Sequence, residues 1–242
     1  MSKAGFQFDP LTHTYFYGGK KMTGVTTVLG MIAKPALIPW AANMAVDYVR
    51  EKSPVVKEGR RNIYQVTTEI LEDARTAHTR RKEERGAEGG NTHAILEDII
   101  KEAIEFSEGY IQRPLFERPK QIMAFIEWSI ENKAKFEISE QVMYHKDWFV
   151  GGTADFVCVI GDKRYVGDFK TQKQIWDRVP FFQMAAYRGM LETMDKKKYD
   201  GSLIVHIPNG ENTIECHYSY DYQSDLEGFL AALTLYRLLK NY

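Results

Sequence analysis

The spacing of hydrophobic and polar positions changes about halfway along the chain. Up to about residue 134, apolar residues mostly recur every three or four positions, which is typical of amphipathic helices. Beyond that point they form alternating or continuous short runs that are typical of strands. The helical pattern covers 26–30, 40–49, 62–85, 90–106 and 119–134, and returns at 176–194 and 222–239. Strand patterns cover 137–145, 150–160, 164–171, 201–207 and 213–218, after an N-terminal hairpin within 6–22.

The order of these elements predicts an α/β (α+β) fold. A helical N-terminal half precedes three strands, a helix, two strands and a helix. We therefore expect a central mixed sheet flanked by helices. At 242 residues, we interpret 1–242 as a single domain, with an N-terminal hairpin and helical region (1–85) followed by a core (86–242).

Composition places the chain among ordinary globular proteins. Apolar residues make up 44% and charged residues 27%, and the net charge is −1. This balance argues against a protein coated with nucleic acid by bulk charge, although it leaves room for a local basic groove.

Cysteine content and hydropathy indicate a reducing, cytoplasmic location. Cys158 and Cys216 are too few for a disulfide framework or a four-cysteine cluster, and we expect both to be buried core thiols. The first six residues contain no apolar stretch of the kind found in signal peptides. No apolar run approaches the roughly 18 residues that a transmembrane helix needs, so we expect no membrane association.

Two acidic residues and a lysine surround one short turn in the strand-rich half. The strands 150–160 and 164–171 meet at Gly161-Asp162, a pair suited to a tight hairpin. If the turn is centred there, the numbers of paired residues sum to 323. Asp155 then lies opposite Asp168, with Cβ atoms about 4.5–5.5 Å apart. Lys170 shares this face, because side chains on a strand alternate.

Two facing carboxylates repel each other when both are ionised. A hard divalent cation such as Mg²⁺ or Mn²⁺ would resolve this conflict. The hairpin therefore predicts a metal site with an ammonium group beside it.

Other segments offer side chains suited to such a site. Gln183 and Tyr187 are four residues apart on one helical face and suit a nucleotide backbone or base, although a surface glutamine beside a core tyrosine is the ordinary alternative. His93 follows a glycine-rich stretch, in the first turn of a helix expected to open around 91–92, where it would bind a metal or serve structure alone. Glu140 is a further carboxylate, which is otherwise simply exposed.

These elements occur in the order of a known family pattern. They match GxxxH (Gly89–His93), GxxD (Gly152–Asp155), (D/E)xK (Asp168–Lys170) and QxxxY (Gln183–Tyr187). The chain resembles the RecB-like branch of the PD-(D/E)xK nuclease superfamily, which includes phage-encoded exonucleases and the mitochondrial genome maintenance exonuclease. The resemblance spans 86–187.

The resemblance implies a restriction-endonuclease-like core in 86–242 and metal-dependent DNA exonuclease activity on single-stranded DNA or DNA ends. It implies that His93, Asp155, Asp168 and the backbone carbonyl of Phe169 bind Mg²⁺ or Mn²⁺, with Glu140 as a further candidate. Lys170 would then orient or deprotonate water, and Gln183 and Tyr187 would position the DNA strand. Some relatives hold an iron–sulfur cluster with four cysteines. Two cysteines cannot, so we expect a cluster-free protein.

The region 1–85 would then help to bind substrate. Between Arg50 and Arg85 lie ten basic and seven acidic residues, which would contact DNA phosphates or form an ordinary solvated helix face. The candidate DNA contacts are Arg60, Arg61, Arg80, Arg81, Arg85 and, close to the metal strand, Lys173. A separate helicase, recombinase or single-strand-binding protein would supply unwound DNA.

Three alternatives remain open. A structure-specific endonuclease can use the same fold. A catalytically inactive member would bind DNA or a protein partner, although the intact Asp155, Asp168 and Lys170 count against this. A metallohydrolase acting on small phosphoesters is the third.

Overall fold

The computed structural model describes residues 5–32, 37–175 and 177–240. The chain divides into a core unit, formed by Met1–Ile32 with Asn91–Tyr242, and a second unit, Ala33–Gly90. The N-terminal hairpin therefore belongs with the core and not with the helical region that follows it. This differs from the boundary that we placed between residues 85 and 86.

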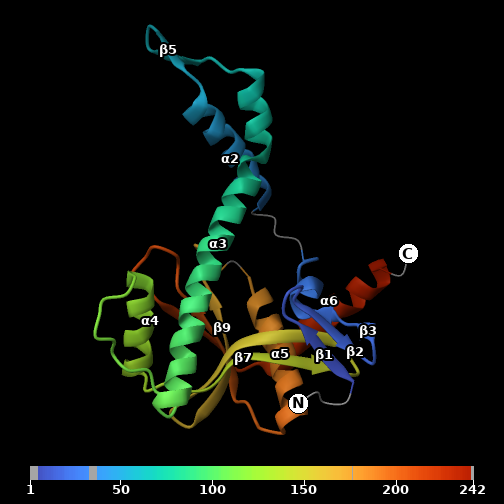
Figure 1. The fold of residues 1–242 in the computed structure, drawn as a ribbon. Coiled ribbons are helices and arrows are strands. Elements are labelled where there is room, and N and C mark those ends of the chain that lie inside the picture. Colours follow the sequence, from blue (N-terminus) through green and yellow to red (C-terminus); the bar gives the residue numbers. More distant parts are fainter. Residues whose placement is uncertain (1–4, 33–36, 176, 241–242) are drawn as a thin grey trace. The chain divides into compact units, whose positions relative to one another are not determined.

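A mixed sheet forms the centre of the core unit, as expected (Figure 1). Three antiparallel strands follow one another along the chain, and a helix then leads to a strand that lies parallel to the third. The strands of this sheet are β4 (Thr23–Gly24), β7 (Lys135–His145), β8 (Val150–Ile160), β9 (Lys163–Lys170), β10 (Gly201–His206) and β11 (Glu215–Ser219). A separate small sheet contains β1 (Phe6–Asp9), β2 (Thr14–Tyr17) and β3 (Lys20–Lys21).

The described residues contain six helices: α1 (Val25–Leu29), α2 (Leu37–Lys52), α3 (Thr68–Phe106), α4 (Lys120–Glu131), α5 (Val179–Asp195) and α6 (Tyr222–Lys240). α3 joins the two segments predicted at 62–85 and 90–106, and each of the other helices lies within or close to one segment whose periodicity predicted a helix. The segment expected at 176–194 is α5, and Trp176 lies outside the described residues. Residues 1–4 also lie outside the described residues. They belong to the N-terminal stretch for which we expect no signal peptide. In the described part of the chain, no helix combines the length and apolar content needed to cross a bilayer.

Two expectations about the helical half were wrong. Residues 62–64 are not helical, because β5 (Val55–Glu58) and β6 (Arg61–Tyr64) form a hairpin that turns at Gly59, where φ is +61°. The helix carrying His93 does not open at 91–92, because α3 continues through the glycines without interruption. Each helical glycine costs only about 1 kcal/mol relative to alanine, which the strong helix formers on either side can offset.

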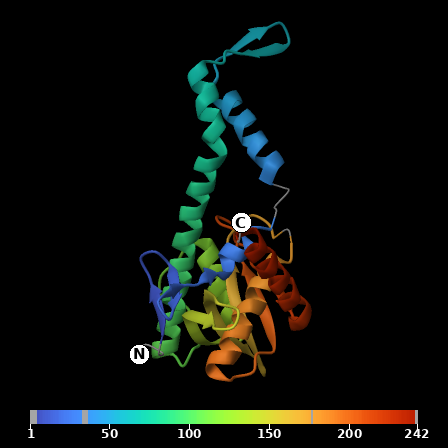
Figure 2. The same cartoon turned by 90° about the vertical axis from the view of Figure 1, so that its right-hand side faces the viewer.

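Helices cover both faces of the central sheet. On one face, α1, α5 and α6 pack on strand residues such as Val157 and Ile204. On the other face, α4 and the part of α3 from Asn91 onward pack on Phe156 and Phe169. Figure 2 shows the same sheet and helices from the side. The buried side chains of both sheet faces therefore pack against helices.

Strand β8 has an interrupted edge. On one side it pairs with β7 along almost its whole length. On the other side β9 pairs only with Phe156–Ile160, and β4 only with Val150 and Gly151. Residues 152–155 therefore have no strand partner on that side among the described strands, and side chains from both helical layers gather at this gap.

The second unit consists of α2, the β5–β6 hairpin and residues 68–90 of α3. The hydroxyl of Tyr48 on α2 donates to Asp73 Oδ2 on α3 at 3.1 Å, and the Arg80 guanidinium lies 5.0 Å from the centre of the Tyr48 ring. These contacts hold the two helices side by side (Figures 1 and 2).

Candidate active site

The two carboxylates of the hairpin lie where the register predicts. The β8–β9 ladder runs from Ile160↔Lys163 to Phe156↔Gly167, so paired residue numbers sum to 323 and Asp155 falls opposite Asp168. At this point the Asp155 carboxylate accepts a hydrogen bond from the Phe169 backbone N–H, at 2.8 Å. The end of the hairpin ladder thus also fixes the orientation of Asp155.

Four side chains from β9 and α5 form one connected network. The Gln183 amide nitrogen donates to Asp168 Oδ1 and to the Tyr187 hydroxyl, both at 3.1 Å. The Lys170 ammonium donates to Gln183 Oε1 at 3.4 Å and forms an ion pair with Asp168 Oδ2. Gln183 therefore orients the acidic and the basic group of the site together.

His93 reaches the site from the opposite helical layer. Its Nδ1 lies 3.5 Å from Asp155 Oδ2, and its ring packs edge-on against Phe169 with the ring centres 5.9 Å apart. Burial lowers the pKa of His93 below its ordinary value, although the negative charge of Asp168 opposes this shift. A neutral imidazole has a nitrogen lone pair available for a metal ion.

The electrostatics of the site favour a bound cation. The pKa of Asp155 lies well above its ordinary value, first because the carboxyl is buried and second because Asp168 is close. Asp168 Oδ2 is buried and accepts no hydrogen bond from any described residue, and Lys170 provides its ion pair. One buried and one largely buried carboxylate beside a neutral imidazole are a donor set that suits a hard divalent ion.

A close approach explains the glycine of the GxxD motif. A Cβ atom at Gly152 would lie 2.4 Å from Cε1 of Tyr187, so only glycine lets this ring lie against β8. Tyr187 is 3% exposed and burial raises its pKa well above the ordinary value, so its hydroxyl stays protonated. The structure therefore places Tyr187 as a buried support for Gln183, and its aromatic face is covered.

Glu140 lies at the edge of this site. Its neighbours on β7 pair with the neighbours of Asp155, which places Glu140 opposite Asp155 in the ladder, with a φ of +51°. The pKa of Glu140 is raised by partial burial and then by the negative charge of Glu97. Its own charge contributes to the raised pKa of Asp155.

Glu97 is an acidic residue that the sequence analysis missed. It lies one helical turn after His93 on α3, and it forms an ion pair with Lys101. Its four-residue spacing from His93 could have identified it in the sequence, because residues at this spacing share a helix face.

The candidate DNA-binding arginines lie in the second unit and differ in their contacts. Arg80 donates to Thr76 and to the Asp73 carbonyl, and Arg81 forms an ion pair with Glu84. The remaining candidates, Arg60, Arg61 and Arg85, are exposed and form no ion pair within the described part of the chain.

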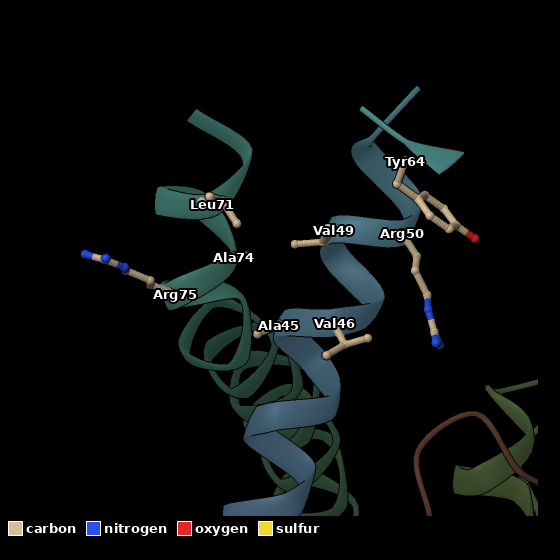
Figure 3. Close-up of a pocket in the computed structure, with 8 residues that line it drawn as sticks. All are labelled: Ala45, Val46, Val49, Arg50, Tyr64, Leu71, Ala74 and Arg75. Carbon is tan, nitrogen blue, oxygen red and sulfur yellow. The ribbon is translucent and has the colours of Figure 1, made fainter. Parts of the chain in front are cut away.

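The second unit also contains an open groove between α2 and α3 (Figure 3). It has a volume of about 620 Å³. Its lining is mostly apolar with two arginines, and consists of Ala45, Val46, Val49, Arg50, Tyr64, Leu71, Ala74 and Arg75.

The remaining candidate for a phosphate contact, Lys173, lies in the core unit. It is exposed in the loop that follows β9.

No family model and no curated protein matches this chain. Among solved structures, the chain is similar to the crystal structure of SSO0001, with 14% identity and a TM-score of 0.29. The match covers 48% of this chain and 56% of that chain, so it spans only about half of either protein. A likeness at this level carries no argument about activity.

Replacing Asp155 with asparagine should stabilise the metal-free protein at neutral pH. Because the folded-state pKa of Asp155 is raised, its contribution to stability is full below the ordinary value of 3.8 and is lost as the pH rises through the folded-state pKa. Asparagine can still accept the Phe169 hydrogen bond without carrying charge. We expect the Tm of Asp155→Asn at pH 8 to exceed that of wild type by about 2–4 °C, as 1 kcal/mol produces in a domain of this size.

Thermal unfolding in chelator from pH 4 to pH 8 measures this difference, which should shrink as the pH falls. The matched control is Asp162→Asn, in the exposed turn of the same hairpin, which should leave the Tm unchanged. A lower Tm for Asp155→Asn than for wild type at pH 8 would contradict the electrostatic account.

Proposed function

We propose that this chain is a divalent-metal-dependent deoxyribonuclease of the RecB-like type that degrades single-stranded DNA or DNA ends as an exonuclease. The observation that carries the proposal is the contact network of the site. Side chains from four separate motifs meet there: His93 from GxxxH, Asp155 from GxxD, Asp168 and Lys170 from DxK, and Gln183 and Tyr187 from QxxxY. The meeting of four motifs from separate parts of the sequence at one site supports the proposal.

The order of the strands supports a restriction-endonuclease-like core. β7, β8 and β9 form an antiparallel meander, and α5 then crosses to β10, which lies parallel to β9. The acidic residues lie on the two strands at the centre of this arrangement, and the QxxxY motif lies on the crossover helix.

Asp155, Asp168, His93 and the Phe169 carbonyl would hold one or two Mg²⁺ or Mn²⁺ ions, with Glu140 and Glu97 as nearby negative charges. When bound, such an ion lowers the pKa of a coordinated water and offsets charge on the scissile phosphate. The raised pKa of Asp155 and the buried Oδ2 of Asp168 support this assignment.

Lys170 would act on the phosphate as a charged hydrogen-bond donor. Its ammonium is held between Asp168 and Gln183 Oε1, so it is positioned before substrate binds. A preorganised cation beside the scissile group stabilises the negative charge that develops during hydrolysis. Gln183 would keep Asp168 and Lys170 in place. Tyr187 would in turn hold Gln183 by accepting a hydrogen bond from its amide.

The second unit would contact the DNA strand. Arg60 in the β5–β6 turn and Arg61 at the start of β6 are exposed and available for phosphates. The groove between α2 and α3 combines an apolar surface with Tyr64 and two arginines, which suits the bases and phosphates of a single strand. Lys173 would add a phosphate contact beside the site.

Degradation of labelled DNA tests the activity. With Mg²⁺ or Mn²⁺, wild type should shorten linear single strands labelled at the 5′ or 3′ end. Asp168→Asn should slow this by about 10³-fold, equivalent to about 4 kcal/mol of barrier, because it removes a metal-binding charge. Asp162→Asn, in the exposed turn, should retain wild-type activity.

Circular single-stranded DNA separates the alternatives. An exonuclease leaves circles intact, whereas cleavage of circles would support an endonuclease on the same fold. Equal degradation by wild type and Asp168→Asn would overturn the site assignment. If wild type degrades no DNA, the result would favour an inactive member of the fold that binds DNA or a protein partner.

The arginines of the β5–β6 turn should strengthen DNA binding through phosphate contacts. Replacing Arg60 and Arg61 with alanine should weaken binding to single-stranded DNA and reduce the slope of log K against log [salt] by about 1.4, at about 0.7 per lost phosphate contact. Fluorescence anisotropy across a salt series in Ca²⁺ measures both quantities. Arg81→Ala, which removes an arginine already paired with Glu84, should leave the slope closer to wild type. Equal effects of the two variants would argue against a phosphate contact at the turn.

A further inference from the structure

A second group of metal-binding side chains lies at the β10–β11 edge of the sheet. His206 on β10 pairs directly with Glu215 on β11, and His217 follows two residues later, so all three point to one face. One nitrogen or oxygen atom from each residue lies within 4.8 Å of the other two. None of these residues belongs to the site described above.

The hydrogen bonds of His206 prepare it as a ligand. Its Nε2 lies 2.6 Å from the backbone carbonyl of Gln172. Because a carbonyl only accepts hydrogen bonds, Nε2 carries a proton, and in the neutral tautomer this leaves the Nδ1 lone pair for a metal ion. Nδ1 lies 3.5 Å from Glu215 Oε2, so the two atoms are placed to share one cation. Metal-binding histidines typically donate their other N–H to a carbonyl or carboxylate in this way.

His217 also has a ring nitrogen that is available for a metal ion. Its Nε2 is buried and has no hydrogen-bond partner among the described residues, and it also lies 3.5 Å from Glu215 Oε2. An unpaired buried polar atom is costly, and few are found in native proteins. A cation at the centre of the three residues would satisfy all three ligand atoms at once.

The distances suit a tetrahedral zinc site. With zinc–ligand bonds of about 2.0–2.1 Å, neighbouring ligand atoms of a tetrahedron lie about 3.3 Å apart. Both nitrogen–oxygen separations here are 3.5 Å. Two imidazoles with one carboxylate favour zinc over magnesium, which prefers oxygen ligands.

We propose that His206 Nδ1, Glu215 and His217 Nε2 bind one zinc ion, with water in the fourth position. The ion would fasten β11 to β10 and, through the His206–Gln172 hydrogen bond, to the loop that follows β9. In the parallel ladder His206 is the partner of Lys170, so this clamp lies directly beside the strand of the candidate active site.

Zinc retention by the full chain tests this proposal. Protein stripped with chelator is reloaded with zinc and dialysed, and bound metal is measured by mass spectrometry. We expect about one zinc ion per chain in wild type and in Asp168→Asn, with zinc affinity at least about 100-fold lower in Glu215→Gln and His217→Gln. Zinc should also raise the Tm of wild type but not that of Glu215→Gln.

The matched controls are Glu211→Gln, an exposed glutamate close to β11, and His78→Gln in the second unit, and both should retain zinc. Substitution by Co²⁺ should give the visible absorption of a tetrahedral site in wild type, Asp168→Asn and both controls, but not in Glu215→Gln or His217→Gln. Equal zinc retention by Glu215→Gln, His217→Gln and the controls would overturn the proposal. So would zinc lost only in Asp168→Asn, which would place the ion at the other site, or no retained zinc. DNA degradation is not a readout here, so this result is independent of the proposed nuclease activity.

Discussion

The structure depends on a repulsion between two carboxylates, the largely buried Asp155 and the buried Asp168, held opposite each other by the β8–β9 hairpin. A folded protein keeps such a pair only if neighbouring groups offset part of its cost. Here the Phe169 N–H, the Gln183 amide and the Lys170 ammonium do so. Despite these contacts, the pKa of Asp155 stays well above its ordinary value. A divalent cation is the simplest group that would offset the remaining repulsion.

The fold supplies the remaining groups from two opposite layers. α5 presents Gln183 on one face of the sheet, and α3 brings His93 from the other. The two layers meet at the interrupted edge of β8, where no strand covers residues 152–155 within the described core. An uninterrupted sheet would separate these helices, so the short β4 and the early end of the β9 ladder are what allow the site to form.

The sequence was sufficient for the hairpin but not for the longer-range features. The Gly161-Asp162 turn and the two-residue period of a strand together determine the register, so the Asp155–Asp168 pair followed directly. The continuity of α3 could not be predicted in this way. Its glycines suggested a helix boundary, but glycine marks a helix end only when the residues beyond it stop being helical. The cluster of His206, Glu215 and His217 depends on the pairing of His206 with Glu215. The eight residues between β10 and β11 leave this pairing unspecified in the sequence.

The central claim is that Asp155 and Asp168 share a divalent ion. Anomalous diffraction from crystals soaked in Mn²⁺ tests it most directly, because the method locates the ion without relying on activity. We predict a peak within about 2.5 Å of carboxylate oxygens from both residues, with His93 beside it. Manganese bound only elsewhere, or no peak between Asp155 and Asp168 at saturating Mn²⁺, would contradict the account.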